Sequence, residues 1–118
     1  FTGRLTSSDL NKVVGSSNGL VYVSYFEGFG IPIIEGMKCG VPVITSNVTC
    51  MPEIAGNAAI LVDPFSVNSI SNGMEELLDK EKYEKFVQLG KKRVLYFSWD
   101  NTAKIVWSCI EDVLNESS

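Results

Sequence analysis

The sequence predicts an α/β fold in which a Rossmann-like parallel sheet is flanked by helices. Three short apolar segments rich in β-branched residues indicate strands, at residues 20–25, 41–45 and 59–62. Segments with helical spacing lie between and after them, and this alternation is typical of a parallel sheet covered on both faces. With 118 residues, of which 45% are hydrophobic, the chain has enough apolar material for one domain core.

The first predicted helix precedes the first strand. Ser7–Asp9 provides capping residues for a helix that carries Leu10, Val13 and Val14 at helical spacing. The Gly- and Ser-rich segment 15–19 ends this helix. Residues 20–25, LVYVSY, then form a strand.

A helix over residues 31–39 and a second strand over 41–45 come next. Gly40 ends the helix. Pro42 is expected at the very start of the strand VPVIT, where the missing N–H removes no ladder donor.

The third strand follows a polar connection and a short helical turn. The connection covers residues 46–51, and the turn covers 52–55 and closes at Gly56. The strand AILV, 59–62, ends at Asp63-Pro64.

Three helices are predicted after the sheet. Ser66 caps the first of them, which has Ile70, Met74, Leu77 and Leu78 on one face. A charged helix covers 81–97. Ser98 caps the last helix, whose apolar stripe consists of Ala103, Val106, Ile110, Val113 and Leu114.

Composition excludes several classes of function. The net charge of -4 argues against a broad surface for nucleic acid, and no apolar run is long enough to span a bilayer. The absence of histidine removes most zinc sites and every Ser-His or Cys-His nucleophile pair. Three cysteines without CxxC spacing are expected to be thiols in a reducing cytosol. We therefore expect a cytoplasmic protein without a metal site.

The segment YFEGFGIPIIEG, residues 25–36, is the candidate site because it follows the first strand. Ligands of parallel sheets bind at the carboxyl ends of the strands. Gly28 and Gly30 leave the backbone uncovered, and Pro32 suits a first helical turn. A helix that starts near Ile31 would direct unsatisfied N–H groups at an anion such as a diphosphate.

Two glutamates flank this predicted anion site. Glu27 precedes the glycines, and Glu35 lies on the second turn of the helix, on the side shared with Ile31 and Lys38. Carboxylates accept hydrogen bonds from hydroxyl groups. A nucleotide-sugar requires hydrogen-bond donors for its phosphates and acceptors for its hydroxyl groups. The N–H groups of the helix start would supply the donors, and the two glutamates would supply the acceptors.

Residue types alone leave alternatives open. The dinucleotide fingerprint fails because Ile33 occupies its third glycine position, and the phosphate loop fails because neither Gly30 nor Gly40 is followed by lysine. A simple tight turn with solvated glutamates remains possible. A pair of acids for glycoside hydrolysis is another alternative, whose carboxylate separation the sequence does not give.

The residues 24–64 resemble the C-terminal lobe of retaining glycosyltransferases of GT-B fold, in particular the glycosyl transferases group 1 (glycosyltransferase family 4). The resemblance depends on a Glu-x7-Glu motif in a Ser-x-x-Glu-Gly-Phe-Gly context. It extends to Gly3-Arg4-Leu5 and to Phe97-Ser98-Trp99, and so covers nearly the whole chain.

The resemblance implies a role for each matching residue. Glu35 would bind the ribose hydroxyls, and Glu27, as the catalytic residue, would lie near the transferred sugar. The N–H groups of Phe29 and Gly30, next to Gly28, would contact sugar hydroxyls, and that of Ile31 the phosphates. Leu5 would lie near the base. No metal or cofactor is implied.

The resemblance also implies missing parts. Such proteins have an N-terminal lobe for the acceptor, and an Arg/Lys pair and two more strands earlier in the C-terminal lobe. We expect residues 1–118 to be one partial domain of a longer enzyme, with any membrane contact made through the missing parts. The expected function is transfer of a hexose from a nucleoside diphosphate to an acceptor hydroxyl. Alternatives are a nucleotide-binding module without transfer activity, a sugar-nucleotide epimerase and a phosphorylase.

Overall fold

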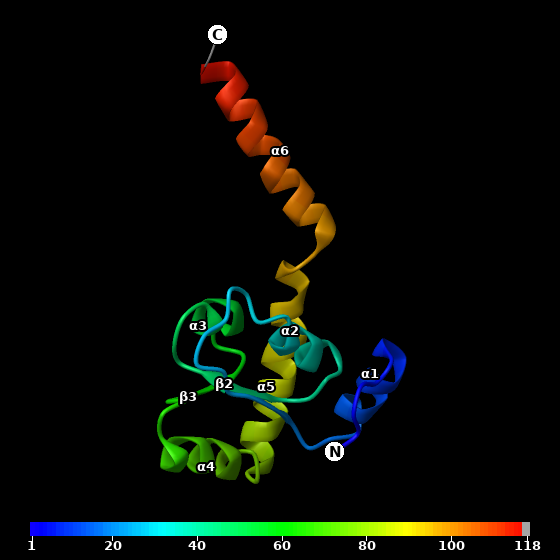
Figure 1. Ribbon diagram of the computed structural model, residues 1–118, viewed down its shortest axis with the longest axis vertical. Helices are drawn as coiled ribbons and strands as arrows, with labels where there is room; N and C mark the ends of the chain where they lie inside the picture. The colour runs from blue at the N-terminus through cyan, green and yellow to red at the C-terminus, as the bar shows by residue number, and fades with distance from the viewer. Residues whose placement is uncertain (117–118) are drawn as a thin grey trace.

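A three-stranded parallel sheet lies at the centre of the computed structural model, which describes residues 1–116 (Figure 1). The strands β1 (Leu20–Tyr22), β2 (Val43–Ser46) and β3 (Ile60–Val62) are arranged in the order β1-β2-β3. In the register of this sheet, Ile44 lies opposite Val21 on one side and Ile60 on the other. The predicted α/β class with a parallel sheet is confirmed.

The predicted helices are present in the predicted order. They are α1 (Ser7–Gly15), α2 (Ile31–Lys38), α3 (Met51–Ala55), α4 (Val67–Glu76), α5 (Lys80–Arg93) and α6 (Trp99–Glu116), with a 3-10 turn η1 (Val94–Tyr96) between the last two. Ser66 and Ser98 cap α4 and α6 as expected, each through its side-chain oxygen. The cap of α1 is Thr6, one residue earlier than predicted, and it accepts a hydrogen bond from the Asp9 N–H.

The strands differ from the prediction at their ends. The first strand stops at Tyr22 rather than at residue 25, and the second runs from Val43 to Ser46 rather than over 41–45. Pro42 lies just before β2, where its carbonyl accepts the Leu20 N–H at 2.9 Å. The expectation that Pro42 removes no hydrogen-bond donor from the sheet is confirmed. The strand begins at Val43, one residue after the proline.

Two other boundaries were predicted wrongly. Met51 was assigned to a polar connection, but it starts α3 and is fully buried in the core. The charged helix predicted over 81–97 is α5, which is capped by Asp79 and ends at Arg93, where the tighter turn η1 begins. Apolar residues continue past this point, so periodicity alone did not show the change of helix type.

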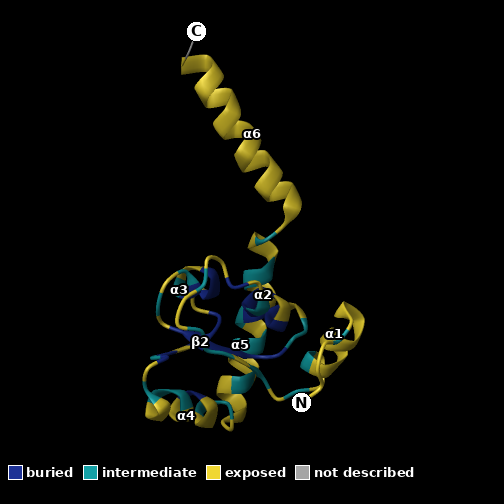
Figure 2. Cartoon of the chain, in the orientation of Figure 1, coloured by how far each residue is buried: buried dark blue, intermediate teal, exposed yellow. Residues whose placement is uncertain are grey.

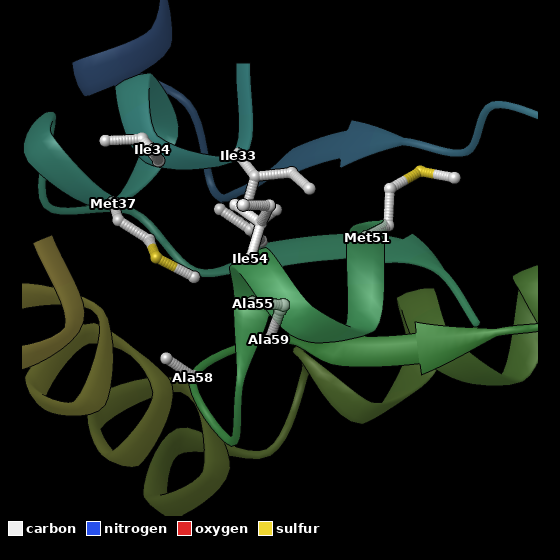
Figure 3. Close-up of a cluster of buried hydrophobic side chains, with 9 residues drawn as sticks. Ile33, Ile34, Met37, Met51, Ile54, Ala55, Ala58 and Ala59 are labelled. Carbon is white, nitrogen blue, oxygen red and sulfur yellow. The ribbon is translucent and has the colours of Figure 1, made fainter. Parts of the chain in front are cut away.

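The helices cover the sheet on two faces and create two apolar clusters. On one face, Val43 packs with residues of α2 and α3, and Figure 3 shows Ile33 of α2 pointing toward Ile54 of α3. On the other face, Ile44 and β3 pack against α4. Figure 2 shows the buried residues concentrated around β2, α2 and α3.

Gly36 allows α2 to lie directly on the sheet. A Cβ atom at this position would lie 2.8 Å from Cδ2 of Leu20 and 2.9 Å from Cγ2 of Val43. Only a glycine at this position permits so close an approach of helix and sheet. The depth of α2 in turn fixes where its N-terminus lies relative to the carboxyl edge of the sheet.

Helix α6 extends away from the rest of the chain (Figures 1 and 2). The predicted apolar stripe is present on it, but the stripe is exposed: Val106 and Ile110 are 54% and 45% accessible. Among the described residues, no helix is long and apolar enough to cross a membrane.

Candidate functional site

The three loops that follow the parallel strands meet at the carboxyl edge of the sheet. Loop 23–30 follows β1, the connection 47–50 follows β2, and residues 63–66 follow β3. A stacked ring pair with a centroid distance of 4.9 Å, Tyr25 and Phe65, joins the first loop to the third. The candidate segment, residues 25–36, thus lies at the edge where parallel sheets bind their ligands.

Helix α2 begins at Ile31, as predicted. Gly30 precedes it with φ of 90°, in the left-handed region that glycine tolerates, and no side chain of residues 1–116 caps the helix. Within the described residues, the N–H groups of Phe29, Gly30 and Ile31 donate no hydrogen bond. These free donors at a helix N-terminus are suited to an anion, and the helix dipole adds to their effect.

Glu27 is held by three hydrogen bonds. Its Oε1 accepts from the hydroxyl of Tyr22 and, at 2.9 Å, from the hydroxyl of Ser24. Its main-chain carbonyl accepts from the Cys50 thiol at 3.1 Å. The Tyr22 hydrogen bond, and after it that of Ser24, lowers the pKa of the Glu27 carboxyl, while the same carboxylate raises the pKa of Tyr22. Glu27 therefore presents an ionised, oriented carboxylate.

Glu35 lies on the exposed side of α2 together with Ile31 and Lys38, as expected. Within the described residues its carboxylate forms no hydrogen bond or ion pair, so it is open to a ligand. The opposite side of the helix is buried in the core, where Met37 lies next to Gly90 of α5. The structure thus gives Glu27 a fixed carboxylate and Glu35 a solvated one.

Phe29 and Gly28 shape the loop in different ways. The ring of Phe29 lies edge-on to Phe97 with centroids 6.0 Å apart. A Cβ atom at Gly28 would meet nothing within 4 Å, so the backbone is open there. The loop is therefore supported at Phe29 by an aromatic contact, while its backbone at Gly28 is uncovered.

Arg93 contacts both α3 and Phe97, the ring that packs against Phe29. Its Nε donates to the carbonyl of Ile54 at 2.9 Å, and its terminal nitrogen donates to the carbonyl of Glu53 at 2.6 Å. Its guanidinium also lies over the Phe97 ring at 5.0 Å. One side chain thus caps the end of α3 and supports the aromatic contact beneath the loop.

Leu5 is half-buried in the segment before α1, which packs beside α2. Among the described residues, no hydrogen bond or ring contact joins it to loop 23–30. Glu27 and the glycine turn lie in loop 23–30 and lead directly into α2, which carries Ile31 and Glu35. Their roles, and that of Leu5, stay predictions.

Sequence reasoning missed the groups that hold the loop. The sequence identifies Tyr22 only as a strand residue, Cys50 only as one of three thiols, and Arg93 only as part of the charged helix 81–97. The Ser24 hydroxyl was available from the motif, because it lies three residues before Glu27. Tyr22 lies five residues before Glu27, a spacing that no helix or strand pattern singles out. The contacts of Cys50 and Arg93 join residues at least 23 positions apart in sequence, and spacing gives no signal for them. Among residues 1–116, no three His, Cys, Asp or Glu side chains gather to form a metal site.

The pattern of the protein family described as Glycosyl transferases group 1 matches residues 1–93. The chain belongs to the glycosyl transferases group 1 family. The resemblance at this family level is confirmed, and the matched residues include the whole candidate site.

The chain is also similar to individual glycosyltransferases. The chain is 37% identical over 102 residues to O-antigen chain mannosyltransferase B of Escherichia coli, covering 86% of this chain. It is 36% identical over 106 residues to the serotype-specific mannosyltransferase WbdA of Escherichia coli, covering 89% of this chain. These matches cover only 27% and 13% of the two relatives.

The solved structure of sucrose-phosphate synthase from Thermosynechococcus elongatus superimposes with a TM-score of 0.84 at 28% sequence identity. The match covers 98% of this chain and 30% of that one. The expected GT-B fold is confirmed, and this group 1 chain corresponds to less than a third of the solved glycosyltransferase.

Proposed function

We propose that this chain is the donor-binding part of a retaining glycosyltransferase of family 4. The longer enzyme would transfer a hexose from a nucleoside diphosphate to an acceptor hydroxyl, with an N-terminal lobe holding the acceptor. The names of the two Escherichia coli relatives favour mannose as the hexose. The observation that carries the proposal is the uncapped start of α2, with free N–H groups between two glutamates.

In this proposal the start of α2 stabilises the leaving diphosphate. The N–H of Ile31 donates to a phosphate oxygen, where negative charge develops in the transition state. The N–H groups of Phe29 and Gly30 donate to sugar hydroxyls, and Leu5 lies near the base. No metal or other cofactor takes part in the proposal.

The two glutamates have separate tasks. The solvated carboxylate of Glu35 accepts hydrogen bonds from the ribose hydroxyls, and the fixed carboxylate of Glu27 accepts from the transferred sugar. The acceptor oxygen bonds to the anomeric carbon on the face from which the diphosphate leaves, the bond between this carbon and the phosphate oxygen breaks, and the acceptor's proton passes to that oxygen. No protein nucleophile is then needed, and attack on the same face retains the anomeric configuration. The enzyme would act in the cytoplasm, with any contact to a membrane made by segments outside this chain.

Kinetics of the full-length protein tests the role of Glu35. Glu35→Ala is expected to raise the donor KM about tenfold, because hydrogen bonds from the ribose to a carboxylate are lost. Glu84→Ala, at an exposed position on α5, is the matched control and should leave KM unchanged. An unchanged donor KM in Glu35→Ala would show that the ribose role is wrong.

Nucleotide binding to this chain alone tests whether it holds a donor without transferring sugar. The chain spans about a quarter of O-antigen chain mannosyltransferase B, so we expect binding without transfer. Calorimetric titration with UDP, GDP and ADP should show one preferred nucleotide. The variant Glu35→Ala should bind that nucleotide with lower affinity. Product analysis of the full-length protein distinguishes transfer from epimerisation and phosphorolysis.

A further inference from the structure

Side chains replace the backbone ladder where β1 ends. In the described part of the chain, the pairing of β1 with β2 ends at Tyr22. Beyond it, three polar side chains from β2 and the start of α3 donate to carbonyl groups of β1 and its loop instead. The contacts are Thr45 to Tyr22 at 2.9 Å, Ser46 to Ser24 at 2.6 Å and Cys50 to Glu27 at 3.1 Å. The end of β1 and loop 23–30 are thus held by hydrogen bonds at Tyr22, Ser24 and Glu27.

Glu27 is the residue of this loop that is held at both its carboxylate and its carbonyl. Tyr22 and Ser24 donate to the carboxylate oxygen Oε1, and Cys50 donates to the carbonyl. Tyr22 and Cys50 are both half-buried and pack against the apolar cluster between the sheet, α2 and α3. Their donors are therefore fixed by packing before any ligand binds.

The Cys50 thiol does not serve the helix that it precedes. Cys50 is the N-cap residue of α3, a position where polar side chains commonly accept a hydrogen bond from the helix. Here no side-chain cap bond forms, and the thiol donates to Glu27. The thiol thus anchors the site loop and leaves the helix start without a side-chain cap.

The shared use of Oε1 has a chemical consequence. One carboxylate oxygen accepts about two hydrogen bonds, and Tyr22 and Ser24 occupy both on Oε1. Within the described residues Oε2 of Glu27 accepts none, so it is the oxygen left for a sugar hydroxyl. Because the carbonyl is also held, neither the backbone nor the carboxylate of Glu27 has to be ordered when the donor binds.

We propose that Tyr22 and Cys50 are positioning residues that direct Oε2 of Glu27 toward the transferred sugar. Both lie outside the Ser-x-x-Glu-Gly-Phe-Gly motif, so the motif alone does not assign them this role. The inference rests on the proposed function, which places Glu27 beside that sugar. Tyr22 acts through its hydroxyl and Cys50 through its thiol, not through the bulk of either side chain.

Steady-state kinetics of full-length variants tests this inference. Tyr22→Phe keeps the packed ring and removes the hydroxyl, and we expect kcat to fall about tenfold while the donor KM stays within about twofold. Cys50→Ala should lower kcat about fivefold, and Cys50→Ser, which restores a donor, should recover it to within about twofold.

Matched controls separate positioning from stability. Tyr83→Phe removes the hydroxyl of a half-buried tyrosine on α5, and Cys39→Ala removes a half-buried thiol at the end of α2. Both controls should leave kcat unchanged. Melting temperatures of all variants show whether a loss of kcat follows a loss of stability.

The outcomes are distinguishable. If Glu27→Gln lowers kcat but Tyr22→Phe and Cys50→Ala do not, the positioning role is overturned and the proposed function stands. If Cys50→Ser behaves like Cys50→Ala, the thiol hydrogen bond has no such role. If Glu27→Gln leaves kcat unchanged, the role of Glu27 is wrong, and the inference falls with it.

Discussion

Gly36 provides the sharpest test of how the sheet positions the candidate site. A methyl group at this position would lie 2.8 Å from Cδ2 of Leu20 and 2.9 Å from Cγ2 of Val43, well inside contact distance. Leu20 can adjust its terminal carbon, but Val43 is fully buried and β-branched, so it has no free rotamer. The substitution Gly36→Ala therefore requires α2 to move away from the sheet.

The expected magnitude follows from two opposing contributions. Overpacking of a filled core costs about 1–3 kcal/mol, and alanine returns up to about 1 kcal/mol of helix propensity. Because the rigid Val43 is one of the two nearest neighbours, we expect the upper end of the cost and a net loss of about 2 kcal/mol in unfolding free energy. Movement of α2 also displaces the N–H groups at its start, so donor affinity should fall as well.

Urea denaturation of the full-length protein, followed by circular dichroism, measures this loss. Gly15→Ala is the matched control, because its new methyl would lie 3.7 Å from the nearest atom, the Cys39 carbonyl oxygen. Because Gly15 is the last residue of α1, that variant should be no less stable than its parent and should gain at most about 1 kcal/mol of helix propensity. In a Val43→Ala background the cost of Gly36→Ala should fall by about 1 kcal/mol or more. A Gly36→Ala protein as stable as its parent would refute the packing argument.

Two further predictions concern the contacts around the loop. Arg93→Ala should lower the unfolding free energy by about 1–3 kcal/mol, because the carbonyls of Glu53 and Ile54 lose their donors, and Arg93→Lys should lose most of the same stability in urea denaturation. If Arg93→Lys has the same unfolding free energy as the parent, the two hydrogen bonds of the guanidinium are not what stabilises α3. The lowered pKa of Glu27 means that its contribution to folding and to kcat is present above the ordinary glutamate pKa and is lost as pH falls through the lower, folded value. Tyr22→Phe should move the acid limb of the kcat profile to higher pH; an unmoved limb would contradict this.

The candidate site was found in the sequence because its signals are local. The glycines, the proline and the two glutamates lie within residues 25–36, and each fixes a property of its own position: backbone freedom, helix start or charge. Periodicity likewise gave the order of helices and strands. These features depend on neighbours within one or two turns, which the sequence displays directly.

Tertiary structure decided how the site is held. The thiol of Cys50 is 23 residues from Glu27, and the guanidinium of Arg93 is 39 residues from the carbonyl of Ile54. The end of β1 was also decided there, because hydroxyl groups of Thr45 and Ser46 take over from the backbone ladder. Pairings of this kind depend on which segments the fold brings together.

The sequence by itself therefore determined the parallel α/β fold, the helix start at Ile31 and the two acids beside it. Only the tertiary structure decided that the two acids differ: Glu27 has one carboxylate oxygen occupied by protein donors, and Glu35 has a carboxylate open to solvent. The physical reason is that charge and backbone preference belong to a residue and its neighbours in sequence. Hydrogen-bond partners and burial belong to the packed chain.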